Sequence, residues 1–210
     1  MTWWIQVAPD LMLPRRLTPL TRAFFARSVL TVARDLLGHL LVHESPAGRT
    51  VGRIVEVEAY RGADDPASHA YRLTPRSRIM AGPPGFAYVY FTYGNHYCVN
   101  VVADREGKAA AVLLRALEPV EGVTLMARRR GIALRGPADL RLIASGPGRL
   151  TQAMAITRQH YGGDLTRPPL YIAAGGPERR RIATSARIGI RRAADRLWRF
   201  YLRDSPYVSR

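Results

Sequence analysis

Apolar positions recur along the chain with two spacings, one typical of helices and one typical of strands. The helical spacing, with Gly and Pro as start and stop signals, predicts helices over 17–25, 29–37, 121–130, 137–144 and 148–160. Shorter apolar or alternating runs predict strands over 39–43, 50–60, 87–91, 97–103, 109–117, 170–173, 188–190 and 200–203. No internal repeat or long linker interrupts the series. We therefore expect one compact α+β domain over residues 17–210, after an irregular lead-in over 1–16.

The strand segment 55–60 reads VEVEAY, and its alternation places Glu56, Glu58 and Tyr60 together on one face. The other face is apolar and suits a core. A carboxylate on a rigid strand beside a tyrosine suits hydrolysis of a glycosidic bond to a flat base. The acid orients water or steadies positive charge on the sugar, while the ring stacks on the base. The alternative is a solvated strand face with a salt-bridging glutamate, which is the more common use of such a motif.

The charge balance favours a polyanionic partner. The chain has 32 basic and 16 acidic residues, a formal net charge of +16 and a pI of about 11.1. All but one of the basic residues are arginine, which binds phosphates through two parallel hydrogen bonds and also stacks on bases. A genomic preference for arginine codons can explain the arginine-for-lysine bias, but it does not explain the excess of positive charge. Nucleic acid is therefore the favoured partner, and a membrane surface is the less favoured one.

The cysteine content, the metal-ligand spacing and the hydropathy of the chain exclude several classes of protein. A single cysteine, Cys98, excludes an internal disulfide and a cysteine-based metal cluster. A metal site from Glu56, Glu58, His69, His96 and Cys98 lacks any supporting spacing, so we expect no metal and no other cofactor. The first residues do not resemble a signal peptide, and no segment is apolar for long enough to span a bilayer. We expect an intracellular protein, cytoplasmic and chromosome-associated in a bacterial-type cell.

Four tyrosines fall within residues 88–97, where two strands flank a predicted turn. Tyr88 and Tyr97 fit ordinary packing within a sheet. Tyr93 lies at the expected tip of the hairpin, where an aromatic ring gains nothing from a core. An exposed ring at such a tip is typical of a wedge that is pushed between stacked bases.

Six segments occur in the order of a known family: VEVEAY at 55–60, ASH at 67–69, TPRSR at 74–78, the stretch 88–100, LLRALEP at 113–119 and SGP at 145–147. Together they resemble the alkyladenine (3-methyladenine, methylpurine) DNA glycosylase family. The resemblance runs from about residue 17 to the end of the chain. It implies a single compact domain around a curved antiparallel sheet with flanking helices. It also implies a protruding β-hairpin that enters the minor groove of DNA.

The resemblance assigns chemical roles to three positions. Glu58 matches the catalytic acid that orients the water attacking the sugar C1′. Arg115 matches an arginine near this water and the DNA backbone, and Ile188 matches a position whose carbonyl helps to hold the water. Glu56 also matches a glutamate of the family, but one without a direct catalytic role, so we expect it to be a structural charge partner.

Five further positions match residues that bind the base. Tyr60 and Tyr90 match the rings that sandwich the flipped base, and His69 matches a histidine of the base pocket. Tyr93 matches the residue that intercalates into the gap left by the flipped nucleotide. Asn100 matches a side chain that clashes with the 2-amino group of guanine.

The resemblance implies a base-excision repair enzyme that flips out alkylated or deaminated purines of duplex DNA and hydrolyses the N-glycosidic bond. Lys108, the only lysine, lies in a polar turn remote in sequence from Glu58, which favours a monofunctional enzyme without Schiff-base chemistry. We expect a monomer. A non-catalytic nucleic-acid-binding protein is the alternative, and a hydrolase of free nucleosides is a third. Glu58 separates the first two, since a carboxylate near phosphates weakens a pure binder.

Overall fold

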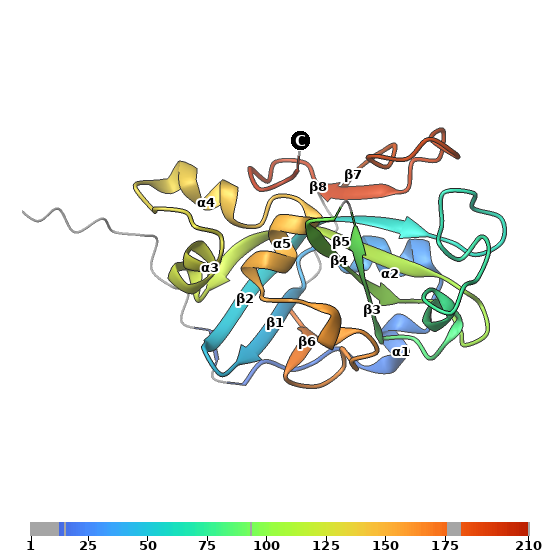
Figure 1. Cartoon of the computed structure of the whole chain (residues 1–210), viewed down its shortest axis with the longest axis horizontal. Coiled ribbons are helices and arrows are strands. Elements are labelled where there is room, and N and C mark those ends of the chain that lie inside the picture. Colours follow the sequence, from blue (N-terminus) through green and yellow to red (C-terminus); the bar gives the residue numbers. More distant parts are fainter. Residues whose placement is uncertain (1–12, 15, 93, 176–181, 210) are drawn as a thin grey trace, which may run out of the picture.

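A long antiparallel sheet organises the fold of this chain, shown as a computed structural model in Figure 1. The structure describes residues 13–14, 16–92, 94–175 and 182–209. The helical elements of this part are α1 (Arg22–Phe25), α2 (Val29–Asp35), α3 (Val123–Arg129), α4 (Pro137–Ile143) and α5 (Pro147–Ala153), with the 3-10 turns η1 (Arg78–Ala81) and η2 (Arg158–His160). The strands are β1 (Leu40–Ser45), β2 (Gly48–Tyr60), β3 (Ala87–Thr92), β4 (His96–Val102), β5 (Ala111–Glu121), β6 (Leu170–Ala173), β7 (Ile182–Ser185) and β8 (Arg199–Leu202).

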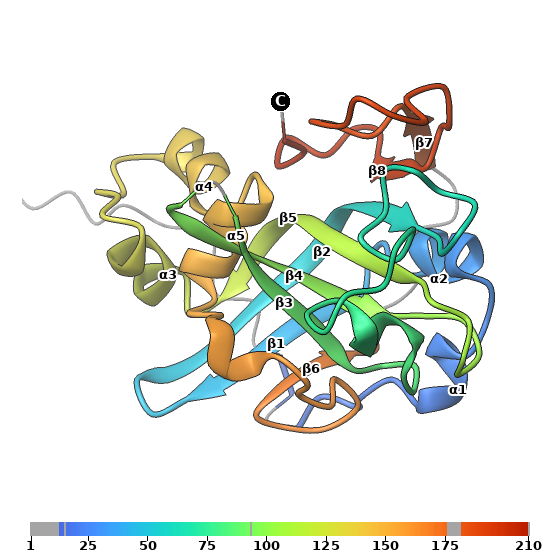
Figure 2. The same cartoon turned by 45° about the vertical axis from the view of Figure 1, so that its right-hand side comes forward.

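Strand β2 is the centre of the sheet because it is paired along both edges. One edge pairs with β5 from Val51 to Tyr60, while the other pairs with β1 over 48–53 and with β8 over 56–58. The main sheet has the order β3-β4-β5-β2-β1-β6, and β7 joins through β8. Every pairing between the described strands is antiparallel, and the sheet curls strongly (Figure 2). The expected α+β fold around a curved antiparallel sheet is confirmed.

The two faces of β2 have different surroundings. Val57 and Ala59 are fully buried in the main core, together with Val112 and Leu114 of β5. Residues of α2, α3 and α5 complete this core on the same face of the sheet. In Figure 2, α1 and α2 lie at one end of the sheet, while α3, α4 and α5 gather at the other end. The opposite face of β2 carries Glu56, Glu58 and Tyr60, and this face forms part of the candidate site.

Two predicted helices are wrong in extent. Of the helix predicted over 17–25, only α1 is helical, because the preceding residues extend beside β6, where Pro19 bridges Ala173 and the Leu20 N–H donates to the Ile172 carbonyl at 2.8 Å. The helix predicted over 148–160 is broken in the middle. Ala155 has a φ of 53°, a left-handed conformation that no α-helix continues through, and η2 follows as a separate turn. The ends of these two helices thus depend on backbone pairing and backbone conformation, which apolar spacing alone does not predict.

The other predicted helices are confirmed within a few residues. Helix α2 ends before Gly38, whose φ of 89° suits the glycine that follows a helix. The strands from β1 to β6 and β8 also match the predictions within a few residues, whereas β7 was not predicted. The first twelve residues lie outside the described part, so the division at residue 17 stays a prediction.

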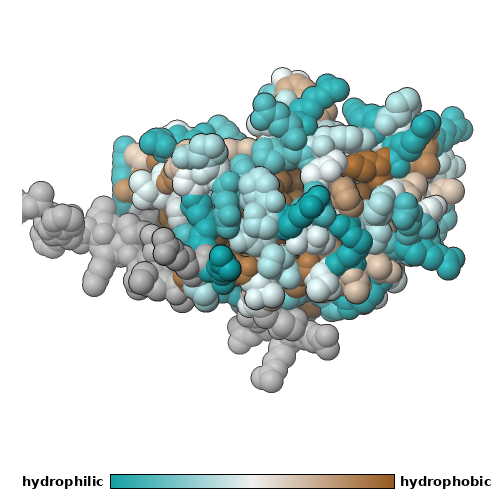
Figure 3. All heavy atoms as spheres, turned by 90° about the horizontal axis from the view of Figure 1, so that it is seen from below, coloured by the Kyte–Doolittle hydropathy of each residue, from teal (hydrophilic) through white to brown (hydrophobic). Residues whose placement is uncertain are grey.

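The helices of the described residues are short, and the exposed residues seen in Figure 3 are mostly hydrophilic. No helix in the described ranges has the length and apolar character needed to cross a membrane. On the face seen in Figure 3, hydrophilic residues dominate and hydrophobic residues form small separate areas.

The turn from β5 to α3 supplies a test of the fold. Gly122 has a φ of 69°, and a Cβ there would collide with the carbonyl oxygen of Arg49. Gly131, just after α3, has a similar φ of 64° but open space around it. Each Gly→Ala change costs roughly 1–2 kcal/mol for the left-handed backbone. We expect Gly122→Ala to lower the free energy of unfolding by at least about 1 kcal/mol more than Gly131→Ala, because of overpacking. Urea unfolding of both variants measures the difference, and equal losses would contradict the described turn.

Candidate active site

The site begins with Glu58, a carboxylate that is fully buried on β2. The Tyr60 hydroxyl donates to its Oε2 at 2.7 Å, and the Ile188 backbone N–H donates to its Oε1 at 2.7 Å. Arg115 Nη1 lies 3.3 Å from Oε1 and supplies a positive charge. The alternative of a solvated strand face is therefore wrong: Glu56 is also fully buried, on the same side as Glu58.

The hydroxyl of Tyr60 is kept protonated by its surroundings. Burial raises its pKa far above the ordinary value, and the neighbouring Glu58 carboxylate raises it further. Tyr60 therefore remains a hydrogen-bond donor to Glu58 at physiological pH. This bond holds the ring in one orientation above the strand that carries both residues.

A β-bulge directs Arg115 toward the two carboxylates. Glu56 pairs with Ala116 and Val57 pairs with Leu114, so Arg115 is the extra residue on β5. Such a bulge re-aims a side chain relative to regular pairing. Burial opposes the charge of Arg115, but the carboxylates of Glu58 and Glu56 outweigh it and raise its pKa. The guanidinium therefore stays charged between the two acids.

Glu56 is the hub of a buried charge network beside Glu58. Its Oε1 accepts from Arg115 Nε at 2.8 Å, Arg199 Nε at 2.7 Å and the Ser209 hydroxyl at 2.8 Å. Its Oε2 accepts from the Ser209 backbone N–H at 2.6 Å. Arg115 Nη2 also donates to the Ser209 hydroxyl at 3.2 Å. Glu56 is thus a charge partner of two arginines, as expected, and it ties β8 and the segment around Ser209 to the centre of the sheet.

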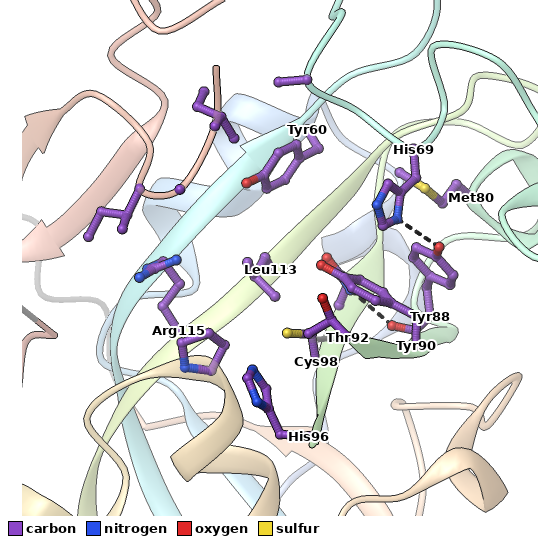
Figure 4. Close-up of a pocket in the computed structure, with 16 residues that line it drawn as sticks. Tyr60, His69, Met80, Tyr88, Tyr90, Thr92, His96, Cys98, Leu113 and Arg115 are labelled. Atoms are coloured by element: carbon purple, nitrogen blue, oxygen red, sulfur yellow. Dashed lines mark hydrogen bonds between the residues drawn. The ribbon is translucent and has the colours of Figure 1, made fainter. Parts of the chain in front are cut away.

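A cavity of about 230 Å³ opens next to this network (Figure 4). Tyr60 lies on one side of the open space, and the rings of His69, Tyr88 and Tyr90 gather on the other. The cavity is lined by Tyr60, Ala67, His69, Met80, Tyr88, Tyr90, Thr92, His96, Cys98, Asn100, Leu113, Arg115, Pro147, Ile188, Gly189 and Ile190. Glu58 itself lies beneath this layer and contacts three lining residues.

The aromatic wall opposite Tyr60 is held by ring contacts and one hydrogen bond. His69 Nδ1 lies 2.9 Å from the Tyr88 hydroxyl, and its ring meets the Tyr90 ring edge-on at 4.7 Å between centroids. Burial and the nearby charge of Arg76 lower the pKa of His69, so its imidazole is neutral at pH 7. Burial raises the pKa of Tyr90 well above the ordinary value. This wall therefore offers uncharged rings to a ligand.

Two polar side chains complete the wall on β4. The Asn100 amide nitrogen donates to the Tyr88 carbonyl at 3.0 Å, which fixes the side chain against its cross-strand neighbour. Burial raises the pKa of the Cys98 thiol to about 11, so the thiol is protonated and a poor nucleophile. Thiolate chemistry is therefore not available at neutral pH.

The structure gathers seven of the eight site residues predicted from the sequence. Six of them line the cavity: Tyr60, His69, Tyr90, Asn100, Arg115 and Ile188. Glu58 is hydrogen-bonded to Tyr60 and Ile188 and forms an ion pair with Arg115. Tyr93, the eighth, lies outside the described residues. The roles assigned to these residues stay predictions.

The strand predicted over 188–190 is wrong. This segment is an irregular bend, since the Ile188 N–H is used on the Glu58 carboxylate and Gly189 has a φ of 76°. The bend brings the segment to the mouth of the cavity.

Other residues of the site escaped the sequence reasoning. Arg199 and Ser209 bond to Glu56, and a buried pair of Asp65 and Arg187 lies behind Tyr60. Arg187 and Asp65 are separated by 122 positions. No local pattern distinguishes these arginines from the many others in the chain.

Comparison with known proteins agrees with this geometry. The family model described as Methylpurine-DNA glycosylase (MPG) matches residues 23–206. Relatives include proteins of Bradyrhizobium diazoefficiens (47% identical; 94% of each chain), Methanoculleus marisnigri (53%; 91% of this chain and 98% of the relative) and Carboxydothermus hydrogenoformans (50%; 91% and 98%). Each of these three relatives carries the name "Putative 3-methyladenine DNA glycosylase".

These matches, with the fold and the site, define a DNA-repair glycosylase that acts on a DNA substrate. The chain belongs to the methylpurine-DNA glycosylase family. Within the described residues, no group of three or more His, Cys, Asp or Glu side chains could hold a metal ion. Independence from cofactors stays a prediction that enzyme assays must test.

The buried network predicts a large difference between two glutamates of the sheet. Glu56→Gln leaves the buried Arg115 and the partly buried Arg199 without their shared carboxylate, so we expect the free energy of unfolding to fall by about 3–5 kcal/mol. Glu118 pairs with Arg53 at 3.2 Å in a partly exposed position, and Glu118→Gln should cost about 0–1 kcal/mol. Urea unfolding of both variants at pH 7 makes the comparison. If Glu56→Gln lowers the free energy of unfolding no more than Glu118→Gln does, the buried network adds little to stability.

Proposed function

We propose that this protein flips alkylated or deaminated purines out of duplex DNA and hydrolyses their N-glycosidic bond, leaving an abasic site. The observation that carries the proposal is Glu58. Its carboxylate is fully buried, is held by two hydrogen bonds and an ion pair with Arg115, and adjoins a cavity between aromatic walls. A slot between rings suits a flat base, and a fixed carboxylate beside it suits attack on the sugar.

The proposed chemistry needs one carboxylate and one water. A carboxylate offers roughly four acceptor positions. Hydrogen bonds from Tyr60 and Ile188 occupy two of those of Glu58, and Arg115 adds an ion pair, which leaves an acceptor position for a water. The C1′–N bond breaks, and its electron pair leaves with the base. Glu58 stabilises the oxocarbenium-like sugar and accepts a proton from the water as the oxygen bonds to C1′. A purine made electron-poor by alkylation leaves readily, so little leaving-group assistance is required. In this proposal the carbonyl of Ile188 also helps to hold the water, and Arg115 lies near it.

Recognition of the base rests on stacking. Tyr60 on one side and Tyr90 with His69 on the other would sandwich a flipped purine, and stacking at about 1–3 kcal/mol per base offsets the unstacking from the duplex. Asn100, fixed by the Tyr88 carbonyl, would disfavour the 2-amino group of normal guanine. Tyr93, on sequence grounds, would fill the gap left in the duplex.

The net charge of +16 supports double-stranded DNA as the substrate, bound by a monomer. A free-nucleoside hydrolase would have no use for such a charge. A non-catalytic binder would have no use for a buried carboxylate beside the base slot. Candidate lesions are 3-methyladenine, 7-methylguanine, hypoxanthine and ethenoadenine. The names of the relatives favour 3-methyladenine as the first substrate to test.

Glu58→Gln should separate catalysis from binding. The change keeps the shape of the side chain but removes the charge and the proton acceptor, so we expect excision to slow by about 10²–10⁴-fold. Binding of lesion-containing duplex should remain, because the walls and the basic surface are unchanged. Single-turnover excision of each lesion, read out by alkaline cleavage, and fluorescence anisotropy measure the two effects. Glu118→Gln is the matched control on the neighbouring strand. Near wild-type excision by Glu58→Gln would remove Glu58 from the catalytic role.

The enzyme should stop at the abasic site. Lys108, the only lysine, is exposed and pairs with Asp104 at 3.1 Å, and it does not line the cavity. Since the only lysine lies away from the cavity, we expect no lysine Schiff base and no cleavage of the strand without added alkali. We expect borohydride to trap no protein–DNA adduct during excision, with a lysine-dependent bifunctional glycosylase as positive control. An adduct that vanishes in Lys108→Ala would show that the enzyme is bifunctional.

A further inference from the structure

An ion pair lies fully buried behind the candidate active site. Arg187 and Asp65 have no exposed side-chain surface, and they are joined by two parallel hydrogen bonds of 2.6 and 2.8 Å. Arg187 Nη1 also donates to the Ala59 carbonyl at 3.0 Å. A planar guanidinium bound in this two-point geometry has a fixed orientation. The pair therefore acts as a rigid link between three parts of the chain.

The Asp65 side of the link holds the loop that carries His69. Its Oδ2 accepts from the Arg61 N–H at 3.2 Å, and its Oδ1 accepts from the Ala67 N–H at 3.2 Å. Both Ala67 and His69 line the cavity. Asp65 thus fixes the start of the loop to the end of β2.

Arg187 is linked to two groups of the proposed chemistry, the ring of Tyr60 and the carboxylate of Glu58. Its guanidinium carbon lies 4.6 Å from the centroid of the Tyr60 ring. The next residue, Ile188, donates its backbone N–H to Glu58. A shift of Arg187 would therefore move the ring on which the base stacks and also a hydrogen bond to the carboxylate.

We infer that Arg187 and Asp65 form a positioning pair, which sets Tyr60 against the base and Ile188 against Glu58. This inference rests on the proposed function. A buried ion pair adds little stability over apolar residues of similar volume, because desolvation of the two charges offsets their attraction. What the pair supplies here is orientation across three segments. A displacement of about 1 Å at a reacting centre lowers a rate by about 10²-fold.

The test uses single-turnover excision, in which a loss of folded enzyme and a loss of rate are separable. An unfolded fraction lowers the amplitude of the reaction, whereas misplacement of Tyr60 or Glu58 lowers the rate constant at saturating enzyme. The variant Asp65→Asn/Arg187→Met removes both charges together and keeps an acceptor oxygen for one of the two loop amides. Arg187→Lys keeps the charge but loses the two-point geometry. Arg196→Met is the matched control, since Arg196 packs 4.6 Å from the Trp198 ring that Arg187 also approaches, at 5.2 Å.

We expect the double variant to lower the rate constant by about 10²-fold and Arg187→Lys to give a smaller loss. The enzyme concentration at half-saturation should stay close to that of the wild type, because the DNA-binding surface is untouched. Arg196→Met should retain the wild-type rate constant. A lower amplitude with an unchanged rate constant in both Arg187 variants would show a purely structural pair and overturn the inference.

The same assay includes the wild type and Glu58→Gln, so the two proposals fail in different ways. If the wild type excises no lesion, or if Glu58→Gln excises normally, the proposed function fails. If both behave as expected while the Arg187 variants keep the wild-type rate constant, only the positioning role fails.

Discussion

Two carboxylates, Glu56 and Glu58, lie fully buried on one face of β2, and their charge has to be compensated without water. Arg115 meets this need for both acids at once, with Nε on Glu56 and Nη1 near Glu58. It reaches this position because a bulge in β5 turns it toward them. Much of the surrounding architecture follows from the same constraint, since β8 brings Arg199 and the last described residues bring Ser209.

The two acids share a cation but differ in their remaining partners. Glu56 is enclosed by two arginines and Ser209, which bind both of its oxygens and leave it a structural role. Glu58 is bound by Tyr60 and Ile188, which both line the cavity. The same residue type on the same strand face therefore has two different environments, and the difference lies in the partners that the rest of the chain brings to each. This is why the alternation in the sequence identified the pair but did not by itself separate their roles.

Local sequence patterns predicted the features that depend on interactions between residues close together in the chain. The alternation of VEVEAY predicted β2 and its two faces, and the glycine after α2 predicted where that helix ends. The bend at 188–190 could not be predicted in this way, because its backbone bonds to Glu58, 130 positions away. The same holds for residues 17–20, which extend only because β6 lies beside them. The positions of Tyr60, His69, Tyr90, Asn100 and Arg115 were found through a resemblance to a family, and the structure brings them around one cavity.

The rings that line the cavity carry no charge themselves, although Arg76 lies near the wall opposite Tyr60. Raised pKa values keep Tyr60, Tyr90 and Cys98 uncharged, and a lowered pKa keeps His69 neutral. The aromatic slot can therefore hold a flat base by stacking, without a charge that would favour one lesion strongly over another. Glu58 lies beneath the lining with Arg115 beside it, and in the proposed function positive charge on the sugar would develop next to this carboxylate. In the proposed function, uncharged rings beside the Glu58 carboxylate would accept several damaged bases, while the same N-glycosidic bond is cut in each case.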